Sequence, residues 1–389
     1  MKTQTSERAP HNLQNLQNPE NPQNLQNPQN LQNPEVPHRP QDLQAFVREY
    51  YGQRLASSAD LKTNACCASG APPGWIAALL ANVHPDVSDR FYGCGFPIPH
   101  ALRAATVLDL GCGTGRDVYV LAQLVGAEGL VHGIDMTEGQ LFLARETAGW
   151  HADKFRYPRP NTRFHQGYVE DLRAVGIADA SVDVVVSNCV VNLSPRKDLV
   201  LAEVFRVLKP GGELYISDVF ADRRLPAEVA SDPVLYAECL GGALYQADFV
   251  RLAQRAGFAD PRVVSAAPVT LRNDEVSRKV GAARFSSVTY RLFKLAGLDA
   301  QCEDYGQSAL YRGGIEGAES LFWLDDHHAF ERGRPERVCG NTAAMLEGTR
   351  FEPWFEVTGS RRTHFGLFPC APTLAASQYA SSSAAGACC

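Results

Sequence analysis

The sequence lacks any run of eighteen apolar residues, which is about the length that a membrane-spanning helix needs, so we expect no membrane span. Its N-terminus is polar and carries no apolar signal segment, which indicates a cytoplasmic rather than a secreted protein. An excess of positive charge is also absent, because 37 Lys and Arg stand against 43 Asp and Glu and leave a net charge of −6. This balance argues against non-specific binding of nucleic acid.

Close cysteine pairs of the Cys-x-x-Cys type are absent too, although the chain has eleven cysteines. That absence argues against a protein that only sequesters zinc or metalloid ions through thiols. Most of the cysteines fall inside or at the ends of predicted strands and helices, and their number is odd, which excludes a small secreted disulfide scaffold. In a cytosolic chain such cysteines act as core, metal-binding or redox groups.

The 389 residues are enough for two folded domains with a large core. Residues 12–35 repeat triplets of the type Asn-(Leu/Pro)-(Gln/Glu), and this period of three fits neither helix nor strand. We therefore predict a disordered arm over residues 1–40. The Ala/Ser-rich residues 371–389, which end in two cysteines, are predicted to be a flexible tail. Between these segments we predict a larger domain over 41–298 and a small C-terminal α+β domain over 299–370.

Apolar strands alternate with helices through the larger domain, a pattern typical of a parallel sheet covered by helices on both faces. The predicted strands are 105–110, 130–135, 163–168, 182–188 and 212–218, with predicted helices at 114–125, 137–149 and 196–208. Two further β-rich runs, 262–270 and 284–294, complete a doubly wound α/β sheet of seven strands with a Rossmann-like order. A helix is also expected over 41–58, and short C-terminal strands are expected at 307–312, 351–358 and 363–369.

A glycine turn in residues 107–116 is the strongest functional signal in the chain. A buried strand runs directly into a Gly-x-Gly-x-Gly turn, and Asp135 follows twenty residues after the last glycine. A turn bare of Cβ atoms lets a ligand approach the backbone, and a carboxylate at the tip of the next strand can accept both ribose hydroxyls. Asp109 stands where a cationic ligand is favoured. The spacing resembles the fingerprint of S-adenosylmethionine (SAM) methyltransferases more than that of nicotinamide enzymes.

Four cysteines stand in contexts that point toward this turn. Cys189 directly follows strand 182–188, and the carboxyl end of such a strand opens onto the ligand crevice. From position alone, a reactive thiol and a buried structural cysteine are equally supported there. Cys239 alone is better explained by packing, and Cys66 and Cys94 lie in loops that resemble a lid. We assign Cys112, inside the glycine turn, to packing.

Taken together, these contexts resemble the arsenite SAM methyltransferases over about residues 42–370. The motifs that carry the resemblance are Lys-Thr-Asn-Ala-Cys (62–66), Tyr-Gly-Cys-Gly (92–95), Asp-Leu-Gly-Cys-Gly-Thr-Gly-Arg-Asp (109–117), Ser-Asn-Cys-Val-Val-Asn-Leu (187–193), Ser-Asp-Val-Phe-Ala-Asp-Arg-Arg (217–224), Glu-Cys-Leu-Gly-Gly-Ala-Leu (238–244) and Asp-Tyr-Gly-Gln-Ser-Ala (304–309). The resemblance implies that Cys189 and Cys239 bind trivalent arsenic. It also implies that Cys66, or its neighbour Cys67, and Cys94 take part in binding and redox turnover.

The resemblance further implies a SAM site and a redox cycle. Its cofactor-binding residues are expected to be Tyr92, Asp109, Gly111, Gly113, Arg116, Asp135, Met136, Val169, Glu170 and Asn188. Arsenic(III) prefers thiolate sulfur, and its lone pair attacks the methyl group of SAM without a general base. A cysteine disulfide then returns arsenic to the trivalent state, and glutathione or thioredoxin resets the thiols. We expect a monomer. The alternative is a small-molecule C-, N- or O-methyltransferase with structural cysteines, and His327–His328 is interpreted as a surface turn rather than a metal site.

Overall fold

The computed structural model describes residues 40–55, 61, 63 and 71–370. These residues belong to one compact unit that begins at Pro37. The predicted N-terminal arm, the tail with Cys388 and Cys389, and both Cys66 and Cys67 lie outside the described residues.

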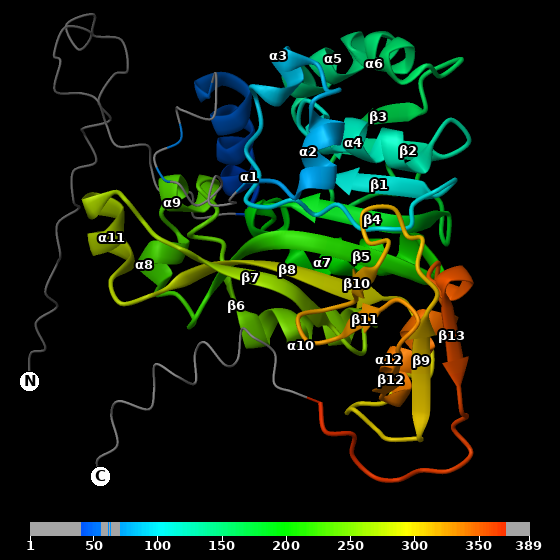
Figure 1. Ribbon diagram of the computed structural model, residues 1–389. Coiled ribbons are helices and arrows are strands. Elements are labelled where there is room, and N and C mark those ends of the chain that lie inside the picture. The colour runs from blue at the N-terminus through cyan, green and yellow to red at the C-terminus, as the bar shows by residue number, and fades with distance from the viewer. Residues whose placement is uncertain (1–39, 56–60, 62, 64–70, 371–389) are drawn as a thin grey trace, which may run out of the picture. The chain divides into compact units, whose positions relative to one another are not determined.

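The main sheet confirms the doubly wound α/β architecture expected from the sequence (Figure 1). Its strands follow the order β3-β2-β1-β4-β5-β8-β7, and a two-residue strand, β6, pairs with the end of β5 as an eighth member. The first five strands pair in parallel, whereas β8 runs antiparallel to both β5 and β7. The bounds are β1 Thr106–Leu110, β2 Leu130–Asp135, β3 Thr162–Gln166, β4 Val182–Asn188, β5 Leu208–Ala221, β6 Leu244–Tyr245, β7 Arg262–Val269 and β8 Phe285–Phe293.

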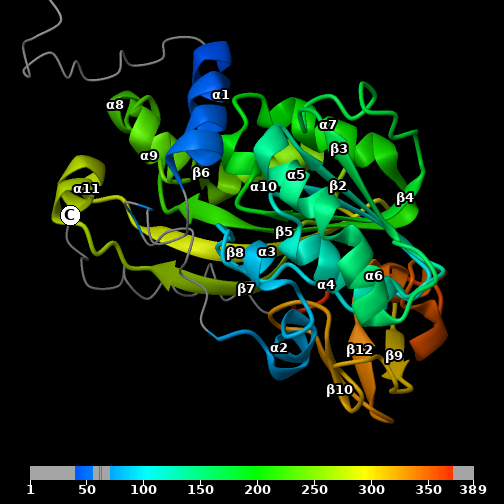
Figure 2. The same ribbon diagram turned by 90° about the horizontal axis from the view of Figure 1, so that it is seen from above.

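Alternate residues of the central strands pack into two separate cores, one on each face of the sheet. Val107 belongs to the core that includes α4, and its neighbour Leu108 belongs to the core that includes α7 and α10. This period of two follows from the strand geometry, and it explains why β1 and β4 are apolar along nearly their whole length. Figure 2 shows α4 and α7 on opposite sides of the strands. The covering helices are α4 Arg116–Val125, α5 Glu138–Glu146, α6 Ala148–Phe155, α7 Lys197–Val207 and α10 Gln246–Ala256.

Outside this set, the described residues before the C-terminal region form six further α-helices, and one of them, α2, packs against α4. They are α1 Pro40–Glu49, which continues into a π-turn at Tyr50–Arg54, α2 Gly74–Leu80, α3 Pro85–Ser88, α8 Ala227–Ala230, α9 Pro233–Ala237 and α11 Asp274–Val280. The helix expected over 41–58 is therefore shorter, and the one expected over 137–149 divides into α5 and α6. The described part of the chain contains no helix long and apolar enough to cross a membrane.

The C-terminal region forms a small sheet with its own aromatic core, drawn in yellow to red in Figure 1. Strand β9 Gln307–Tyr311 lies between β12 Pro335–Val338 and β13 Phe355–Thr358, and both neighbours are antiparallel to it. A hairpin of β10 Leu321–Trp323 and β11 Ala329–Glu331 and the helix α12 Gly340–Glu347 complete it. The predicted strand at 363–369 is not formed, because only Leu367 makes an isolated bridge, to Glu303.

Buried ion pairs join this region to the main sheet. Glu213 of β5 pairs with Arg291 of β8 and, at 2.5 Å, with Arg350 of the C-terminal region. A second pair joins Arg262 of β7 to Asp325 at 3.1 Å. The His327–His328 pair belongs to this second network, because His328 Nδ1 lies 2.7 Å from Asp325 Oδ1. The histidines do lie in a turn, between β10 and β11, as expected, but this turn is half-buried and packs against Arg262 rather than lying free on the surface.

Candidate active site

The glycine turn lies between β1 and α4 and forms the floor of a pocket. Gly111 and Gly113 both adopt positive φ angles, +63° and +54°, which L-residues with side chains rarely adopt. A Cβ atom at Gly111 would overlap the side chain of Val190, whereas one at Gly113 would find only Gln140 Oε1, at 4.0 Å. The backbone of Gly113 therefore faces open space, where a ligand can approach it.

All ten residues predicted to bind the cofactor line this single pocket. They are Tyr92, Asp109, Gly111, Gly113, Arg116, Asp135, Met136, Val169, Glu170 and Asn188. They converge because the carboxyl ends of β1, β2 and β4 meet at one edge of the sheet. The pocket is also lined by residues that sequence reasoning missed, among them Gln44 and Tyr51 from the N-terminal segment.

Asp135 is fixed at the tip of β2 by backbone donors. Its Oδ2 accepts the N–H of Gly113 at 2.9 Å, and its Oδ1 accepts the N–H of Thr137 at 2.8 Å. Burial raises the pKa of Asp135 above its ordinary value, and these two hydrogen bonds act in the opposite direction. The carboxylate is thus oriented before any ligand arrives.

Three carboxyl groups concentrate negative charge at the pocket. Burial first, and then the charges of Asp117 and Asp135, raise the pKa of Asp109 well above its ordinary value. Arg116 offsets part of this charge through its pair with Asp117 Oδ1 at 2.7 Å, and its guanidinium stacks 3.0 Å from the ring centre of Phe91. A ligand with a positive centre is favoured in such an environment.

Asn188, at the end of β4, holds the segment that carries Cys94. Its Oδ1 accepts the backbone N–H groups of Cys94 at 3.0 Å and Gly95 at 3.2 Å. Its Nδ2 donates to Gly95 O at 3.0 Å and to Asp117 Oδ2 at 2.9 Å. One side chain thereby connects the pocket, the strand end and the cysteine segment.

Three of the four predicted arsenic-site cysteines come together beside the pocket. Cys94 and Cys189 form a disulfide, and Cys239 Sγ donates to the backbone carbonyl of Cys189 at 3.4 Å. All three are buried in one apolar cluster. Cys189 and Cys239 both adopt positive φ angles, 58° and 62°, which place a non-glycine residue in a strained region. The sulfur atoms of Cys189 and Cys239 lie within 4.8 Å of each other and of a carboxylate oxygen of Asp218.

Asp218 and Lys197 are ionisable groups at this cluster that sequence reasoning missed. Asp218 accepts the N–H groups of Val219 at 2.8 Å and Asn192 at 3.1 Å, yet burial raises its pKa to about 7. Burial lowers the pKa of Lys197 to about 8, and its Nζ donates to backbone carbonyls of Asn192 and Ser194. Asp218 follows the same strand-end rule as Cys189, so its place next to β4 was the available signal.

Glu238, directly before Cys239, ties the N-terminal segment to the site. Its carboxylate accepts the hydroxyl of Tyr50 at 2.5 Å, and both the N–H and the hydroxyl of Thr63 at 2.8 and 2.7 Å. Thr63 stands three residues before Cys66 in the chain. Thr63 is therefore anchored to the residue directly before Cys239.

Comparison with known proteins identifies the family. Residues 305–389 match the model of the arsenite methyltransferase C-terminal domain, and residues 102–257 match a methyltransferase domain model. The arsenite methyltransferase of Aquipseudomonas alcaligenes is 54% identical over 344 residues, which cover 88% of this chain and 99% of that protein. The chain belongs to the arsenite methyltransferase family. The arsenite methyltransferase of Mus musculus is 47% identical over 315 residues, or 80% of this chain and 82% of that relative.

A solved structure supports the same family assignment. An arsenic(III) S-adenosylmethionine methyltransferase from Chlamydomonas reinhardtii matches with a TM-score of 0.75 and 50% identity. The match covers 77% of this chain and 100% of that structure. The resemblance inferred from the sequence motifs is confirmed, and the chain is a SAM-dependent methyltransferase. The acidic pocket floor and the oriented Asp135 fit a cofactor that carries a sulfonium charge and a ribose.

Proposed function

We propose that this enzyme methylates trivalent arsenic, in the form of arsenite and methylarsenite, and thereby detoxifies it. The observation that carries the proposal is the convergence of Cys94, Cys189 and Cys239 beside the cofactor pocket. Packing alone does not require three cysteines at the carboxyl edge of the sheet, next to an acidic pocket. Arsenite is also the substrate in the names of the relatives described above.

In this proposal, separate groups of pocket residues contact the ribose, the adenine and the methionine end of the cofactor. Asp135 accepts the ribose hydroxyls, while Met136, Val169 and Glu170 contact the adenine. The methionine end lies among Tyr92, Asp109, Gly111, Gly113, Arg116 and Asn188. When bound, SAM supplies an electrophilic methyl group on its sulfonium sulfur. The carboxylates of Asp109 and Asp117 favour that positive charge, which supports this orientation.

Thiolates of Cys189 and Cys239 hold arsenic, and Cys94 or Cys66 supplies a third sulfur for unmethylated arsenite. Soft thiolates are the preferred ligands of a soft trivalent centre. The arsenic lone pair is the nucleophile, so no side chain has to remove a proton from it. The contribution of the protein is to hold arsenic in line with the methyl group at roughly 3–3.5 Å. The buried apolar cluster around the three cysteines excludes water from this contact.

A disulfide cycle restores the trivalent state. Methyl transfer formally oxidises arsenic to the pentavalent state, and closing a disulfide from two thiolates returns the two electrons. The Cys94–Cys189 disulfide is the kind of product that this step leaves. A thiol reductant of the glutathione or thioredoxin class then reopens the pair, because Cys189 must be a thiolate again before the next arsenic binds. The family resemblance assigns Cys66 to this cycle as well.

The test is product analysis by arsenic-specific chromatography after incubation with arsenite, SAM and glutathione. Wild-type enzyme is expected to give methylated arsenic, and Cys189→Ser and Cys239→Ser are each expected to lose at least 100-fold in rate, about 3 kcal/mol in barrier. Circular dichroism and SAM binding serve as controls for folding. Full activity of Cys189→Ser would contradict the thiolate assignment. SAM binding without any arsenic product would favour a small-molecule C-, N- or O-methyltransferase with structural cysteines.

Three further expectations stay predictions within this proposal. We expect a cytoplasmic enzyme, because its thiol cycle needs a reducing compartment. We expect a monomer, with no nucleic-acid or membrane partner. The domain division at residue 298 also stays a prediction, although the family models end at 257 and resume at 305.

A further inference from the structure

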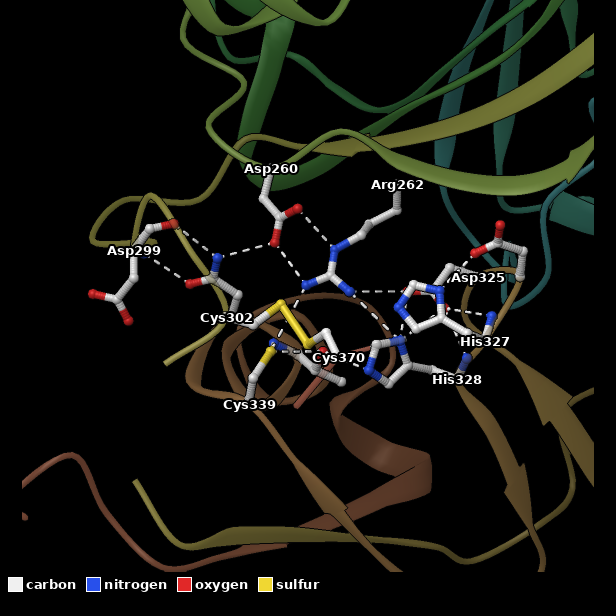
Figure 3. Close-up of a disulfide and its surroundings, with 12 residues drawn as sticks. Asp260, Arg262, Asp299, Cys302, Asp325, His327, His328, Cys339 and Cys370 are labelled. Carbon is white, nitrogen blue, oxygen red and sulfur yellow. Dashed lines mark hydrogen bonds and ion pairs between the residues drawn. A yellow bond between two sulfur atoms is a disulfide. The ribbon is translucent and has the colours of Figure 1, made fainter. Parts of the chain in front are cut away.

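A second group of cysteines lies in the C-terminal region, outside the site described above. The sulfur atoms of Cys302, Cys339 and Cys370 all lie within 4.8 Å of one another (Figure 3). Cys302 and Cys370 form a disulfide, and Cys339 is a buried thiol beside it. As far as the structure describes the chain, the cofactor pocket is lined by none of the three. We propose that these cysteines, once the disulfide is reduced, bind one trivalent arsenic as a second, non-catalytic site.

The backbone brings the three cysteines together independently of the disulfide. The N–H of Phe368 donates to Cys302 O at 2.8 Å, which holds the segment of Cys370 against that of Cys302. The N–H of Gly340, next to Cys339, donates to Glu303 O at 2.9 Å. Because these contacts do not involve the sulfur atoms, the three thiols stay near one another after reduction.

Hydrogen bonds fix the position of the Cys339 sulfur. Cys339 is the N-cap residue of α12, and its Sγ accepts the backbone N–H of Thr342 at 3.4 Å. Arg262 Nη2 donates to the same sulfur at 3.8 Å, and Asp260 and Asp325 hold the guanidinium in place. These contacts hold the Cys339 sulfur beside the other two, so reduction of the disulfide presents three sulfur ligands at one place.

The number of ligands distinguishes trivalent arsenic from zinc. Structural zinc takes four ligands in a tetrahedron, whereas trivalent arsenic takes three and keeps a lone pair. Among the described residues, the group formed by Cys302, Cys339 and Cys370 contains three sulfurs and no histidine or carboxylate. Asp325, His327 and His328 lie nearby but form a separate group, tied together by the contact of His328 Nδ1 with Asp325 Oδ1 at 2.7 Å.

The binding step balances in atoms and electrons. A phosphine or dithiol reductant first gives two electrons to the Cys302–Cys370 disulfide, and two protons complete the thiols. Arsenite, As(OH)3, then reacts with the three thiols: three As–S bonds replace the three As–O bonds, and each departing hydroxyl group takes one thiol proton, which gives three water molecules. Cys302 and Cys370 are half-buried, so arsenic can enter from solvent, while Cys339 is the buried ligand. The inference takes from the proposed function only that the enzyme encounters trivalent arsenic. The cluster is then a redox-gated store that keeps arsenic out of the methylation pocket.

The test uses the full chain with Cys189→Ser and Cys239→Ser, which removes the catalytic thiols and makes the result independent of methylation. The protein is incubated with arsenite and the phosphine TCEP and desalted, and the bound arsenic is measured by mass spectrometry. We expect Cys339→Ser in this background to lose one equivalent of arsenic per chain, while α12 stays capped because serine is a good N-cap. Cys112→Ser is the matched control and should keep the stoichiometry. Equal arsenic binding with and without Cys339 would overturn the proposal.

Further measurements test which atoms bind arsenic and whether the disulfide must first be reduced. Arsenic K-edge absorption of the Cys112→Ser control protein should include a site with three sulfur neighbours that Cys339→Ser removes. Omitting TCEP should remove the same equivalent, since the disulfide then withholds two ligands. Zinc in place of arsenite should not be retained, and zinc retention that depends on Cys339 in the absence of arsenic binding would overturn the assignment. A failure of the methylation assay with intact binding here would contradict only the proposed function.

Discussion

The side-chain oxygen of Asn188 accepts the backbone N–H of Cys94 at 3.0 Å, so a residue of the cofactor pocket sets the position of a cysteine that pairs with Cys189. The same amide group donates to Asp117. Asn188 therefore connects the pocket to the cysteine segment, which gives the first prediction.

Asn188→Ala should lower the methylation rate at least 10-fold, because two N–H groups of the Cys94 segment lose their shared acceptor and the segment shifts away from Cys189. Asn188→Asp should not rescue the rate, since it loses the donor to Gly95 O and brings a carboxylate to Asp117. The disulfide should also form more slowly, as measured by thiol alkylation and mass spectrometry. Asn82→Ala is the control. The side-chain amide of Asn82 donates to Gln123 at 2.9 Å, and neither residue lines the pocket. Wild-type rates in Asn188→Ala would contradict this positioning role.

Asp135→Ala should weaken SAM binding about 10- to 100-fold. Two hydrogen bonds from ribose hydroxyls to a charged acceptor contribute roughly 1.5–3 kcal/mol, and the Gly113 N–H also loses its acceptor. Isothermal titration calorimetry measures the affinity, with the exposed Asp153→Ala as control. An unchanged dissociation constant would show that Asp135 does not bind the ribose.

Asp218→Asn should change how stability depends on pH. Unfolded aspartate ionises near pH 4 and folded Asp218 near pH 7, so the wild-type free energy of unfolding falls as pH rises through that interval. The Asp218→Asn variant does not show this decrease in the free energy of unfolding. Its stability relative to wild type should therefore increase by roughly 2 kcal/mol between pH 5 and pH 8, measured by urea unfolding. Asp198→Asn, exposed and paired with Arg196, should show no such trend. A pH-independent difference for Asp218→Asn would rule out the raised pKa.

Glu213→Gln should destabilise the protein by roughly 3–5 kcal/mol, because Arg291 and Arg350 would remain buried without their counter-charge. The melting temperature should fall, and hydrogen exchange should increase in the C-terminal sheet that Arg350 connects to β5. Glu356→Gln is the matched control. Its pair with Arg312 is half-exposed, so its loss should cost about 0.5 kcal/mol or less.

The sequence was sufficient to predict the architecture of the main sheet and a set of ten residues that line one pocket. Apolar strands buried on both faces are recognisable without their neighbours, and the strand-end rule brings Asp109, Asp135 and Asn188 to one edge. The direction of β7 and β8 was not predictable in the same way, because apolar composition does not distinguish an antiparallel pair. All ten predicted cofactor-binding residues line the pocket at the carboxyl edge of the sheet.

The C-terminal region shows why other elements were missed. Helix α12 is buried over most of its length and begins at a cysteine cap, so it shows neither an amphipathic stripe nor a usual N-cap residue. The histidine network depends on Arg262, 66 residues from His328, which no local pattern reveals. The raised pKa of Asp218 and the lowered pKa of Lys197 arise from burial, which is a property of the folded chain.

The positive φ angles of Cys189 and Cys239 have a consequence for laboratory evolution. A non-glycine residue in this region costs on the order of 1 kcal/mol or more, and glycine removes that cost. Selection for thermostability alone, without arsenic in the medium, should therefore enrich glycine at position 239, whereas glycine at position 189 would also lose the disulfide with Cys94. The resulting proteins would melt later and still bind SAM, but they would have discarded their chemistry. Any programme that seeks a more durable arsenic-removing catalyst must hold these two codons fixed and look for stability elsewhere.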